Sequence, residues 1–469
     1  MFYETDTIAA VSTALGTGGI GIIRISGKNA GCIADGIFHA KISVAQMKSH
    51  TIQYGKIVDP ATGEEVDEVM LTKMSAPATY TREDVIEINC HGNMISQRRI
   101  LALLFHSGAR PAEAGEFTKR AFLNGRIDLT QAEAVIDVIN SRTSMSHDAA
   151  VAQLSGSVSG YLNSVIDRLL TVMARIEVTV DYPEHDDEMK EAVIARDELN
   201  DIKAELNRAL QSYNTGRLIK SGINTVIIGK PNVGKSTLLN EMAGFQRAIV
   251  TDIPGTTRDI IEEEIDIDGI LLNLTDTAGI RQTEDVVEQI GVNMAMGSLK
   301  NADLIIYVAD LSDNQPVEEA LIEEIRGRKA ILVFNKEDLL GEEATVHRVS
   351  DIVAGCGLSP EDYRTVVTSL TDPGKRGASV VKEAVKELFV TGAVSKNEEI
   401  IITAERHVNL LEKSLNSLDS ALCALQEDIP LDMISIDIRN AADFLGEITG
   451  TSIKEDLIDR IFSSFCLGK

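Results

Sequence analysis

The chain has 469 residues, 44% of them hydrophobic and 25% charged, which is enough for roughly two to four soluble globular domains. A net charge of −27 argues against a protein that coats nucleic acid regardless of sequence, because such binding needs clustered Lys and Arg. The first residues lack the basic start and apolar run of a signal peptide, and no stretch approaches the roughly 18 apolar residues of a membrane helix. The five cysteines are odd in number and follow no metal-ligand spacing, which is typical of a protein in the reducing cytoplasm. With no membrane segment predicted, we expect a cytoplasmic protein without membrane attachment.

The first half of the chain shows two successive sequence patterns. Residues 1–121 mix alternating β-type runs, at 19–25 and 85–89, with glycine-rich turns and a helical stretch near 94–105, which predicts an α+β domain. From 122 to 221 apolar residues recur at steps of three and four, which predicts helices. The clearest apolar stripe consists of Leu162, Val165, Ile166, Leu169, Met173, Ile176 and Val180.

In the second half of the chain, β-type runs first alternate with helical stretches, and the pattern then becomes helical again. Residues 222–391 alternate β-type runs with helical stretches, which predicts an α/β domain with a doubly wound, mostly parallel sheet. The expected strands are 224–228, 260–267, 271–275, 304–309, 331–334 and 365–367. Residues 392–469 carry a helical stripe of Val408, Leu411, Leu415, Leu418, Leu422 and Leu425. We expect a multidomain protein in which the α/β domain is inserted into a discontinuous helical domain; a separate helical domain on each side is the alternative.

A phosphate-binding loop opens the α/β domain. Residues 229–236, Gly-Lys-Pro-Asn-Val-Gly-Lys-Ser, match the P-loop pattern directly after one apolar strand and before a helical run. In such a loop the backbone N–H groups and the helix N-terminus face phosphate oxygens. Lys235 is expected to reach the β- and γ-phosphates and Ser236 to bind Mg²⁺. The nucleotide contacts predicted here are Asn232, Val233, Gly234, Lys235, Ser236 and Thr237.

Two motifs that sense the γ-phosphate follow in order. In Gly-Thr-Thr-Arg-Asp at 255–259, Thr257 can complete the Mg²⁺ shell. In Asp-Thr-Ala-Gly at 276–279, Asp276 can hold a Mg²⁺-bound water and Gly279 can donate its N–H to the γ-phosphate. The nucleotide contacts predicted for these segments are Thr251, Thr256, Thr257, Asp276, Thr277, Ala278 and Gly279.

A third group of residues recognises the base. In Asn-Lys-Glu-Asp at 335–338, the Asp338 carboxylate can accept hydrogen bonds from guanine N1–H and its 2-amino group, which adenine cannot supply. Thr-Ser-Leu at 368–370 would complete the pocket. The base contacts predicted are Asn335, Lys336, Asp338 and Ser369. Together these motifs predict a GTP hydrolase that uses Mg²⁺.

The predicted site lacks two parts found in GTPases of the Ras type. There a glutamine after the equivalent of Gly279 orients the attacking water, whereas this chain has Ile280. No arginine finger can be identified either. Arg258 and Arg281 are candidates, but a surface or salt-bridge role suits each of them better.

With these motifs in place, the chain resembles the MnmE (TrmE) family of tRNA modification GTPases over essentially its whole length. The residues that carry the resemblance are 6–10 (Asp-Thr-Ile-Ala-Ala), 21–27, 114–117, 120–124, 128–134 and the terminal Phe-Cys-Leu-Gly-Lys at 465–469. The resemblance implies that K⁺ takes the place of an arginine finger, and that a glutamate aligned with Glu288 orients the water. Lys235 and Asn232 complete the implied catalytic set, and the K⁺ ligands implied are Asn232, Thr251, Ile253 and Thr256.

The same resemblance implies a homodimer formed through the N-terminal domain, which binds a tetrahydrofolate one-carbon derivative. The folate contacts implied are Arg24, Glu87, Arg126 and Lys469, with Cys466 nearby, whose chemical role stays open. Arg126 stands where the family commonly has lysine, and its geometry differs from that of lysine. The ordinary alternatives are an edge-strand surface position for Glu87 and a salt bridge for Arg24.

The resemblance also implies a partner and a reaction. Together with a flavin-dependent MnmG-type protein, in a heterotetramer, such a GTPase adds an aminomethyl or carboxymethylaminomethyl group to C5 of the wobble uridine of certain tRNAs. The expected domains are 1–121 for folate binding and dimerisation, 122–221 and 392–469 for the helical domain, and 222–391 for the GTPase domain. The principal alternative is a ribosome-assembly GTPase without modification chemistry. A regulatory scaffold that binds folate without transferring its carbon is another.

Overall fold

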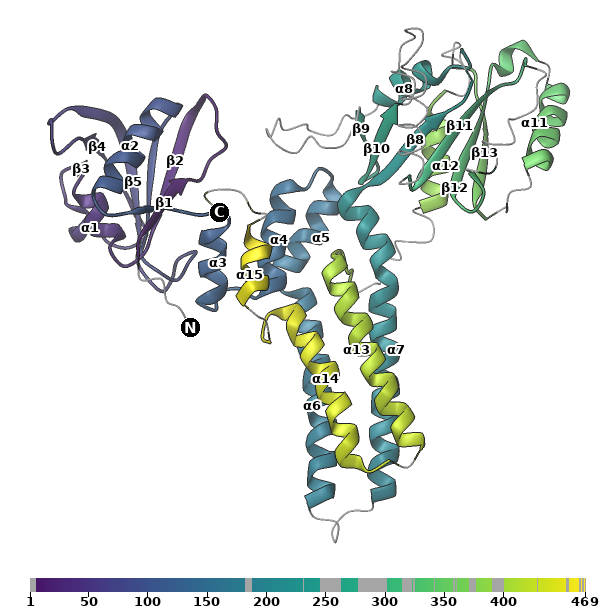
Figure 1. Cartoon of the computed structure of the whole chain (residues 1–469). Coiled ribbons are helices and arrows are strands. Elements are labelled where there is room, and N and C mark those ends of the chain that lie inside the picture. Colours follow the sequence, from purple (N-terminus) through teal and green to yellow (C-terminus); the bar gives the residue numbers. More distant parts are fainter. Residues whose placement is uncertain are drawn as a thin grey trace, which may run out of the picture. The chain divides into compact units, whose positions relative to one another are not determined.

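The computed structural model describes residues 6–181, 188–230, 232–244, 263–276, 302–313, 323, 325–340, 342–356, 359, 361–370, 377–389, 400–427, 429–452, 455–463, 465 and 468. The chain divides into two compact units (Figure 1). The first comprises Met1–Ile136, Gln153–Ala195 and Asn416–Lys469, and the second comprises Asp137–Ala152 and Arg196–Leu415. Within the described part of the chain, no helix is both long and apolar enough to cross a membrane.

The first unit contains a seven-stranded sheet with the order β3-β4-β5-β6-β2-β1-β7. Its strands are β1 (Ile8–Val11), β2 (Gly18–Ser26), β3 (Phe38–His39), β4 (Thr51–Val58), β5 (Glu65–Met74), β6 (Val85–Gly92) and β7 (Arg110–Pro111). All neighbours are antiparallel except β1 and β7. The helices α1 (Ala30–Asp35) and α2 (Met94–His106) pack on one face and bury its aliphatic side chains. This confirms the predicted α+β domain, including its strands near 19–25 and 85–89 and its helix.

The opposite face of this sheet carries side chains that α1 and α2 leave uncovered. Side chains alternate along a strand, so Arg24 points away from the core that contains Ile23 and Ile25. In-register pairing sets Arg24 and Glu87 side by side in the row that continues to Thr72 and Ile52. The exposed apolar side chains of this face include Ile52, Tyr54 and Met70.

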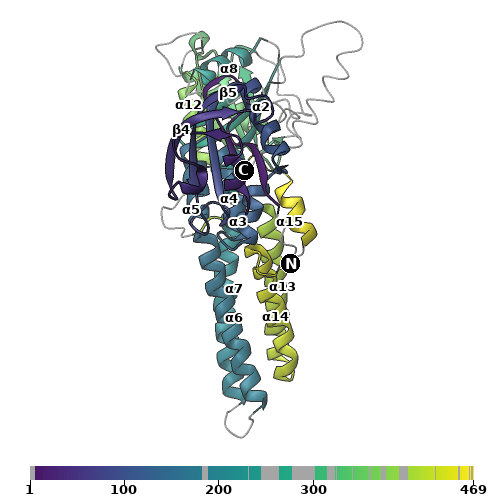
Figure 2. The same ribbon diagram turned by 90° about the vertical axis from the view of Figure 1, so that its left-hand side faces the viewer.

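Helices from both ends of the chain complete the first unit. The helix α6 (Ser157–Asp181) packs alongside α14 (Leu431–Thr449), although the whole α/β domain separates them in the sequence (Figures 1 and 2). Each turns its apolar stripe inward, since Leu162, Val165, Ile434 and Ile438 are all buried. The helical segments therefore pair across the insertion, as the discontinuous helical domain predicted. Further helices of the chain are α3 (Glu116–Leu123), α4 (Leu129–Asn140), α5 (Ser144–Leu154), α7 (Glu188–Ser221), α13 (Glu405–Gln426) and α15 (Glu455–Phe462).

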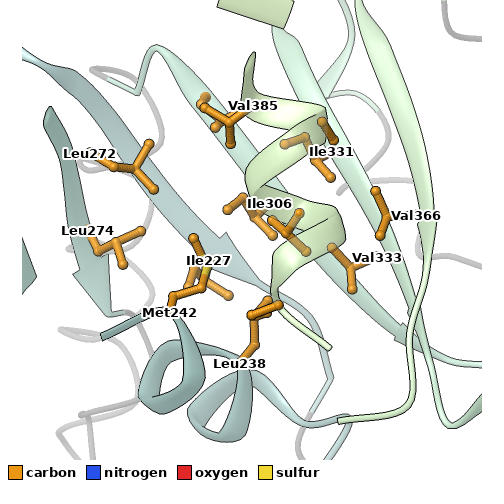
Figure 3. Close-up of a cluster of buried hydrophobic side chains, with 14 of the residues drawn as sticks. Ile227, Leu238, Met242, Leu272, Leu274, Ile306, Ile331, Val333, Val366 and Val385 are labelled. Atoms are coloured by element: carbon orange, nitrogen blue, oxygen red, sulfur yellow. The ribbon is translucent and has the colours of Figure 1, made fainter. Parts of the chain in front are cut away.

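The second unit contains a six-stranded sheet with the order β13-β12-β11-β8-β10-β9. Its strands are β8 (Ile223–Ile228), β9 (Glu263–Ile267), β10 (Ile270–Asp276), β11 (Leu304–Asp310), β12 (Lys329–Asn335) and β13 (Tyr363–Val367). Only β9 pairs antiparallel, and apolar clusters fill both faces. One of these clusters lies between the sheet and the helices α8 (Lys235–Ala243) and α12 (Ser379–Phe389) (Figure 3). The helix α11 (Glu342–Cys356) belongs to the other face. This is the predicted doubly wound, mostly parallel sheet.

Candidate nucleotide and cofactor sites

The phosphate loop lies between β8 and α8, as its sequence pattern requires. Gly234 has φ +108°, and a Cβ there would collide with the side-chain amide of Asn335, so only glycine fits before the helix. Asn232 also has a left-handed backbone, with φ +62°. The Lys235 Nζ donates hydrogen bonds to the carbonyl oxygens of Gly229 (2.8 Å) and Lys230 (2.7 Å). Its ammonium group thus lies inside the loop whose N–H groups and helix N-terminus suit phosphate.

The base-recognition residues lie at the carboxyl ends of β12 and β13, next to this loop. The buried side-chain amide of Asn335 donates to the carbonyl of Val233 (2.8 Å), 102 residues away in the sequence. Its Oδ1 accepts a hydrogen bond from the Leu370 N–H (3.2 Å). The Ser369 hydroxyl donates to Asp338 Oδ1 (2.7 Å), which orients that carboxylate. The structure thus brings the P-loop, Asn335–Asp338 and Ser369 into one site.

Asp310 is a residue of this site that the sequence analysis missed. It ends β11, between the strands that carry the P-loop and Asn335, and forms an ion pair with Lys336. Burial opposes its ionisation, but the hydrogen bonds from Lys336 and Ser312 outweigh this effect, so its pKa is lowered. The pair holds Lys336, which has a left-handed backbone (φ +67°). The available signal was an acidic residue at the end of a buried strand, the position that Asp276 also has.

Several predicted residues lie outside the part of the chain that is described. Asp276 is the last residue of β10 and pairs in register with Ile227 of β8, so its backbone lies next to the start of the P-loop. Its side chain is not among the described parts of the structure. Ser236 lies in the first turn of α8. A Mg²⁺ ion would be held here by the Ser236 hydroxyl, with the Asp276 carboxylate acting through a bound water. The predicted residues outside the description are Thr251, Ile253, Thr256, Thr257, Thr277, Ala278, Gly279, Glu288, Cys466 and Lys469.

A second polar constellation lies on the sheet of the first unit. Arg24 and Glu87 are in-register partners on β2 and β6, and the Arg24 Nε and Nη2 lie 2.9 and 2.8 Å from Glu87 Oε1. The Arg24 guanidinium lies 5.3 Å from the ring centroid of Tyr80, and the Arg126 guanidinium lies 4.8 Å from the same ring. The structure therefore brings Arg24 and Arg126 to the ring of Tyr80, with Glu87 bonded to Arg24. Tyr80 was not among the residues predicted from the sequence.

Two ordinary interpretations of these residues can now be compared with the structure. Glu87 lies on β6, an interior strand between β5 and β2, so an edge-strand position is wrong. Arg24 does form a salt bridge, and its partner is Glu87 itself. No pattern in the sequence marks Tyr80, since it lies in an irregular loop between β5 and β6.

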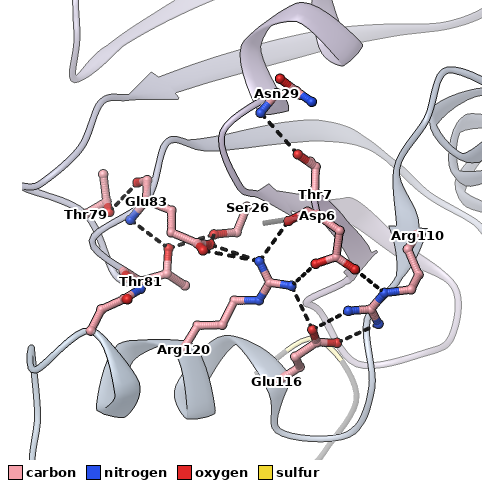
Figure 4. Close-up of polar contacts among 11 residues, drawn as sticks. Asp6, Thr7, Ser26, Asn29, Thr79, Thr81, Glu83, Arg110, Glu116 and Arg120 are labelled. Carbon is pink, nitrogen blue, oxygen red and sulfur yellow. Dashed lines mark hydrogen bonds and ion pairs between the residues drawn. The ribbon is translucent and has the colours of Figure 1, made fainter. Parts of the chain in front are cut away.

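A partly buried ionic network, with Arg120 and Glu116 at its centre, fastens this loop and α3 to the sheet (Figure 4). The Arg120 guanidinium bonds Asp6 Oδ1 (2.8 Å), Glu83 Oε1 (3.2 Å) and Glu116 Oε1 (2.9 Å). Arg110 bonds the same Asp6 (Nε to Oδ2, 2.6 Å) and Glu116 (Nη2 to Oε1, 2.7 Å). The side chains of Arg120 and Glu116 are only 6% and 4% exposed. Ion pairs this deeply buried hold their geometry, because a lost partner leaves an uncompensated charge.

The C-terminal segment reaches the same sheet. Phe465 is buried and its ring lies 5.1 Å from that of Phe462, the last residue of α15. The Ser12 hydroxyl, directly after β1, donates to the carbonyl oxygen of Gly468 (3.0 Å). Gly468 has φ +86°, and a Cβ there would collide with the carbonyl oxygen of Val11. The end of the chain is therefore seated against the strand that pairs with the Arg24 strand.

Comparison with known proteins identifies the family to which the chain is similar. Residues 7–126 match the family model described as "GTP-binding protein TrmE N-terminus", and residues 129–466 match the model of the "MnmE helical domain". Curated relatives with the name tRNA modification GTPase MnmE match over their whole length. One from Acetivibrio thermocellus is 51% identical over 468 residues, covering 100% of both chains. Another, from Alkaliphilus metalliredigens, is 45% identical over 473 residues, again covering 100% of both.

The comparisons and the geometry agree. The phosphate loop, the base-recognition residues and the sheet order are those of a GTP-binding domain, and both flanking segments match models of one family. Relatives matching end to end carry out GTP hydrolysis in tRNA modification, as their name states. The chain thus belongs to the MnmE family of tRNA modification GTPases.

Proposed function

We propose that this protein is a K⁺-activated GTP hydrolase that acts with a flavin-dependent MnmG-type partner on tRNA. Together they install an aminomethyl or carboxymethylaminomethyl group at C5 of the wobble uridine of certain tRNAs in the cytoplasm. The observation that carries the proposal is the presence of two distinct sites in one chain: a guanine-nucleotide site and the cluster of Arg24, Glu87 and Arg126. A ribosome-assembly switch, the alternative, needs the nucleotide site but has no use for the second cluster.

The nucleotide site has assigned roles in this proposal. Lys235 neutralises the β- and γ-phosphates, while Ser236 and Thr257 bind Mg²⁺. Asp276 holds a Mg²⁺-bound water, and Gly279 donates to the γ-phosphate. Asp338 accepts from the guanine edge and is oriented for this by the Ser369 hydroxyl. Charge that develops on the leaving phosphate oxygens is stabilised by groups that are already in place.

A monovalent cation supplies the charge that an arginine finger supplies elsewhere. The proposed K⁺ ligands are Asn232 together with Thr251, Ile253 and Thr256. The left-handed backbone of Asn232 supports the proposal, because among the described residues of the loop it is the non-glycine residue that adopts this uncommon conformation. We expect hydrolysis to be much faster in K⁺ than in Na⁺, and Asn232→Ala to abolish the difference. Equal rates of the wild-type protein in the two salts would contradict the proposal.

Glu288 is the proposed water-orienting residue, since the side chain of Ile280 has no group that can hydrogen-bond a water. We expect Glu288→Ala to bind GTP with unchanged affinity and to lose most of its turnover, whereas Glu288→Gln keeps a hydrogen-bonding group and retains more. Single-turnover hydrolysis and nucleotide titration measure the two properties separately. Turnover at the wild-type level in Glu288→Ala would remove this residue from the mechanism.

The Arg24 cluster is proposed to bind a tetrahydrofolate one-carbon derivative, which supplies the one-carbon unit of the modification. The donor set fits such a molecule. Glu87 offers a carboxylate to the N–H groups of a pterin, and Arg24 and Arg126 offer N–H donors to its acceptors and carboxylates. The hydrogen bond from Ser12, directly after β1, to Gly468 supports Lys469 as a further contact.

The uncovered sheet face supports the proposed homodimer through the N-terminal domain. Ile52, Tyr54 and Met70 are 52%, 61% and 45% exposed on neighbouring strands, and such a patch is unusual unless a partner covers it. We expect Met70→Glu to shift the protein toward the monomer in light scattering. The matched control is Ala61→Glu, which adds the same charge on the exposed turn before β5. A Met70→Glu protein that remains fully dimeric would place the interface elsewhere.

Mass spectrometry of the wobble uridine decides between the proposal and the alternative. In a strain that lacks this gene, the C5-modified uridine should disappear, and expression of the wild-type chain should restore it. Loss of the modification without a defect in ribosomal subunits supports the proposal. If the deletion strain keeps as much C5-modified wobble uridine as the parent strain and shows a defect in subunit assembly, the ribosome-assembly function is favoured.

A further inference from the structure

We propose that Tyr80 is a positioning residue of the N-terminal site, whose ring holds the guanidinium groups of Arg24 and Arg126 so that both contact one anionic ligand. The proposal rests on the proposed function only in taking this ligand to be a folate. Cations favour the negative face of an aromatic ring at such distances. The two guanidinium carbons lie 5.3 and 4.8 Å from one ring centroid, so they are at most 10.1 Å apart. One elongated ligand can therefore span them.

The ring itself is held in place from two sides. Its hydroxyl hydrogen-bonds Thr118 Oγ1 at 2.9 Å, and Thr118 is fully buried on α3. The following residues are tied to the end of the same helix: Asn124 Nδ2 donates to the carbonyl of Thr81 (2.6 Å), and Arg82 donates to the carbonyl of Asn124 (2.8 Å). A tyrosine anchored through its hydroxyl and through the two residues that follow it offers a fixed surface for a flexible side chain.

Arg126 is the residue that most needs such a surface. It is exposed, and within the described part of the chain its guanidinium has no hydrogen-bond or ion-pair partner. A long exposed side chain samples many rotamers and loses this freedom when it binds a ligand. Contact with the Tyr80 ring restricts Arg126 beforehand while its N–H groups stay available. The ring thus lowers the entropy cost of binding an anion.

Arg24 is held differently, and the difference defines the ligand class. Its guanidinium already pairs with Glu87 and also lies 5.7 Å from the Phe117 ring. It therefore presents a donor beside an acceptor, whereas Arg126 presents donors alone. Two guanidinium groups and one carboxylate make up this set, so cationic groups outnumber anionic ones. This arrangement suits a molecule with a polar head group at Arg24–Glu87 and an anionic group at Arg126, which describes a pterin with a carboxylate tail.

Two substitutions at position 80 separate the electrostatics of the ring from its volume. Tyr80→Phe keeps the ring and loses only the hydroxyl, whereas Tyr80→Leu fills space but has no π face. With 5-formyltetrahydrofolate as the probe in isothermal titration, we expect Tyr80→Phe to bind within about threefold of the wild type. Loss of two cation–π contacts should weaken binding by Tyr80→Leu about tenfold. Thermal unfolding of each variant checks that the domain is folded.

A second readout needs no folate. The Nε–Hε signals of Arg24 and Arg126, assigned by Arg24→Lys and Arg126→Lys, report the ring current of Tyr80 in the free full-length protein. We expect Tyr80→Leu to move both signals and Tyr80→Phe to leave them nearly unchanged. If neither signal moves in Tyr80→Leu, or if Leu and Phe bind folate equally well, the positioning role is wrong. If the wild type shows the ring-current shifts but binds no folate, the proposed folate function fails while the positioning of the two arginines stands.

Discussion

The side-chain amide of Asn335 donates a hydrogen bond to the carbonyl oxygen of Val233 and so joins the base-recognition strand β12 to the phosphate loop. The same amide accepts a hydrogen bond from the N–H of Leu370, after β13. Only 4% of Asn335 is exposed, so water cannot replace these bonds easily. One buried side chain thus fixes the spacing between the parts of the site that bind base and phosphate.

We therefore expect Asn335→Ala to weaken the binding of GTP and GDP alike. The substitution leaves the buried Val233 carbonyl and Leu370 N–H without partners, each at a cost of roughly 1–3 kcal/mol. The expected loss of affinity is about 10- to 100-fold, measured with a fluorescent guanine nucleotide. Asn273→Ala is the matched control, because Asn273 is a buried amide of the same sheet that bonds Ser221 and Asn224 instead. Equal affinities in both variants would show that the Asn335 bridge does not matter for binding.

Base specificity should follow the side chain at position 338. In Asp338→Asn the carboxylate becomes an amide, whose N–H can donate to the C2 carbonyl of xanthine but cannot accept two bonds from guanine. The Ser369 hydroxyl can still donate to its oxygen. We expect GTP binding to fall by about 100-fold or more and xanthosine triphosphate binding to rise, which competitive displacement measures. A variant that keeps its preference for GTP would place base recognition at another residue.

Acid should destabilise the network around Glu116. Burial raises the pKa of Glu116, but hydrogen bonds from Arg110, the Glu113 N–H and Arg120 outweigh it, so the pKa lies below 4.5. The hydrogen bond from Arg110 also lowers the pKa of Asp6 below 3.8, against the opposing effect of burial. For a carboxyl with a depressed folded-state pKa, the stabilisation is complete above about pH 5 and is lost as pH falls through the folded-state value.

Glu116→Gln tests this network directly. It removes the buried charge that faces Arg110 and Arg120, so we expect the local stability of β1 and α3 to fall by about 3 kcal/mol or more at neutral pH. The variant should also lose part of the acid dependence. Hydrogen exchange of these two elements between about pH 2.5 and 7 measures both effects, because the loss occurs below about pH 5. Glu113→Gln is the control, since that side chain is exposed. Exchange at the control level would mean that the network contributes little.

The contact of Gly468 with Val11 and Ser12 should be disrupted by a single added methyl group. In Gly468→Ala the new Cβ collides with the Val11 carbonyl, and alanine also disfavours φ +86°. We expect the C-terminal end to leave the sheet, so that a carboxypeptidase specific for terminal lysine releases Lys469 several-fold faster. Gly63→Ala is the matched control, because Gly63 also has positive φ but has no neighbour within 4 Å of its Cβ position. Equal release rates from the two variants would show that the Gly468 contact does not hold the C-terminal segment on the sheet.

Local patterns in the sequence were sufficient for most of the fold and the nucleotide site. The P-loop was predictable because phosphate binding needs a strand, a glycine-containing loop and a helix in immediate succession. The buried strands of the parallel sheet were predictable because both of their faces are apolar. Likewise, the stripes on α6 and α13 indicated that each helix buries one face. In all these cases the information lies within a few residues of the element it describes.

The sequence by itself therefore determined the family, the element types and the P-loop, Asn335–Asp338 and Ser369 motifs of a GTPase. Only the tertiary structure decided which distant groups meet: Asn335 with Val233, Arg24 with Glu87, and both arginines with Tyr80. The physical reason is that an amphipathic pattern specifies which face of an element is buried but not which partner buries it. Strand register and helix packing over tens to hundreds of residues set those pairings. For this reason Tyr80, in an irregular loop without periodicity, emerged only from the folded chain.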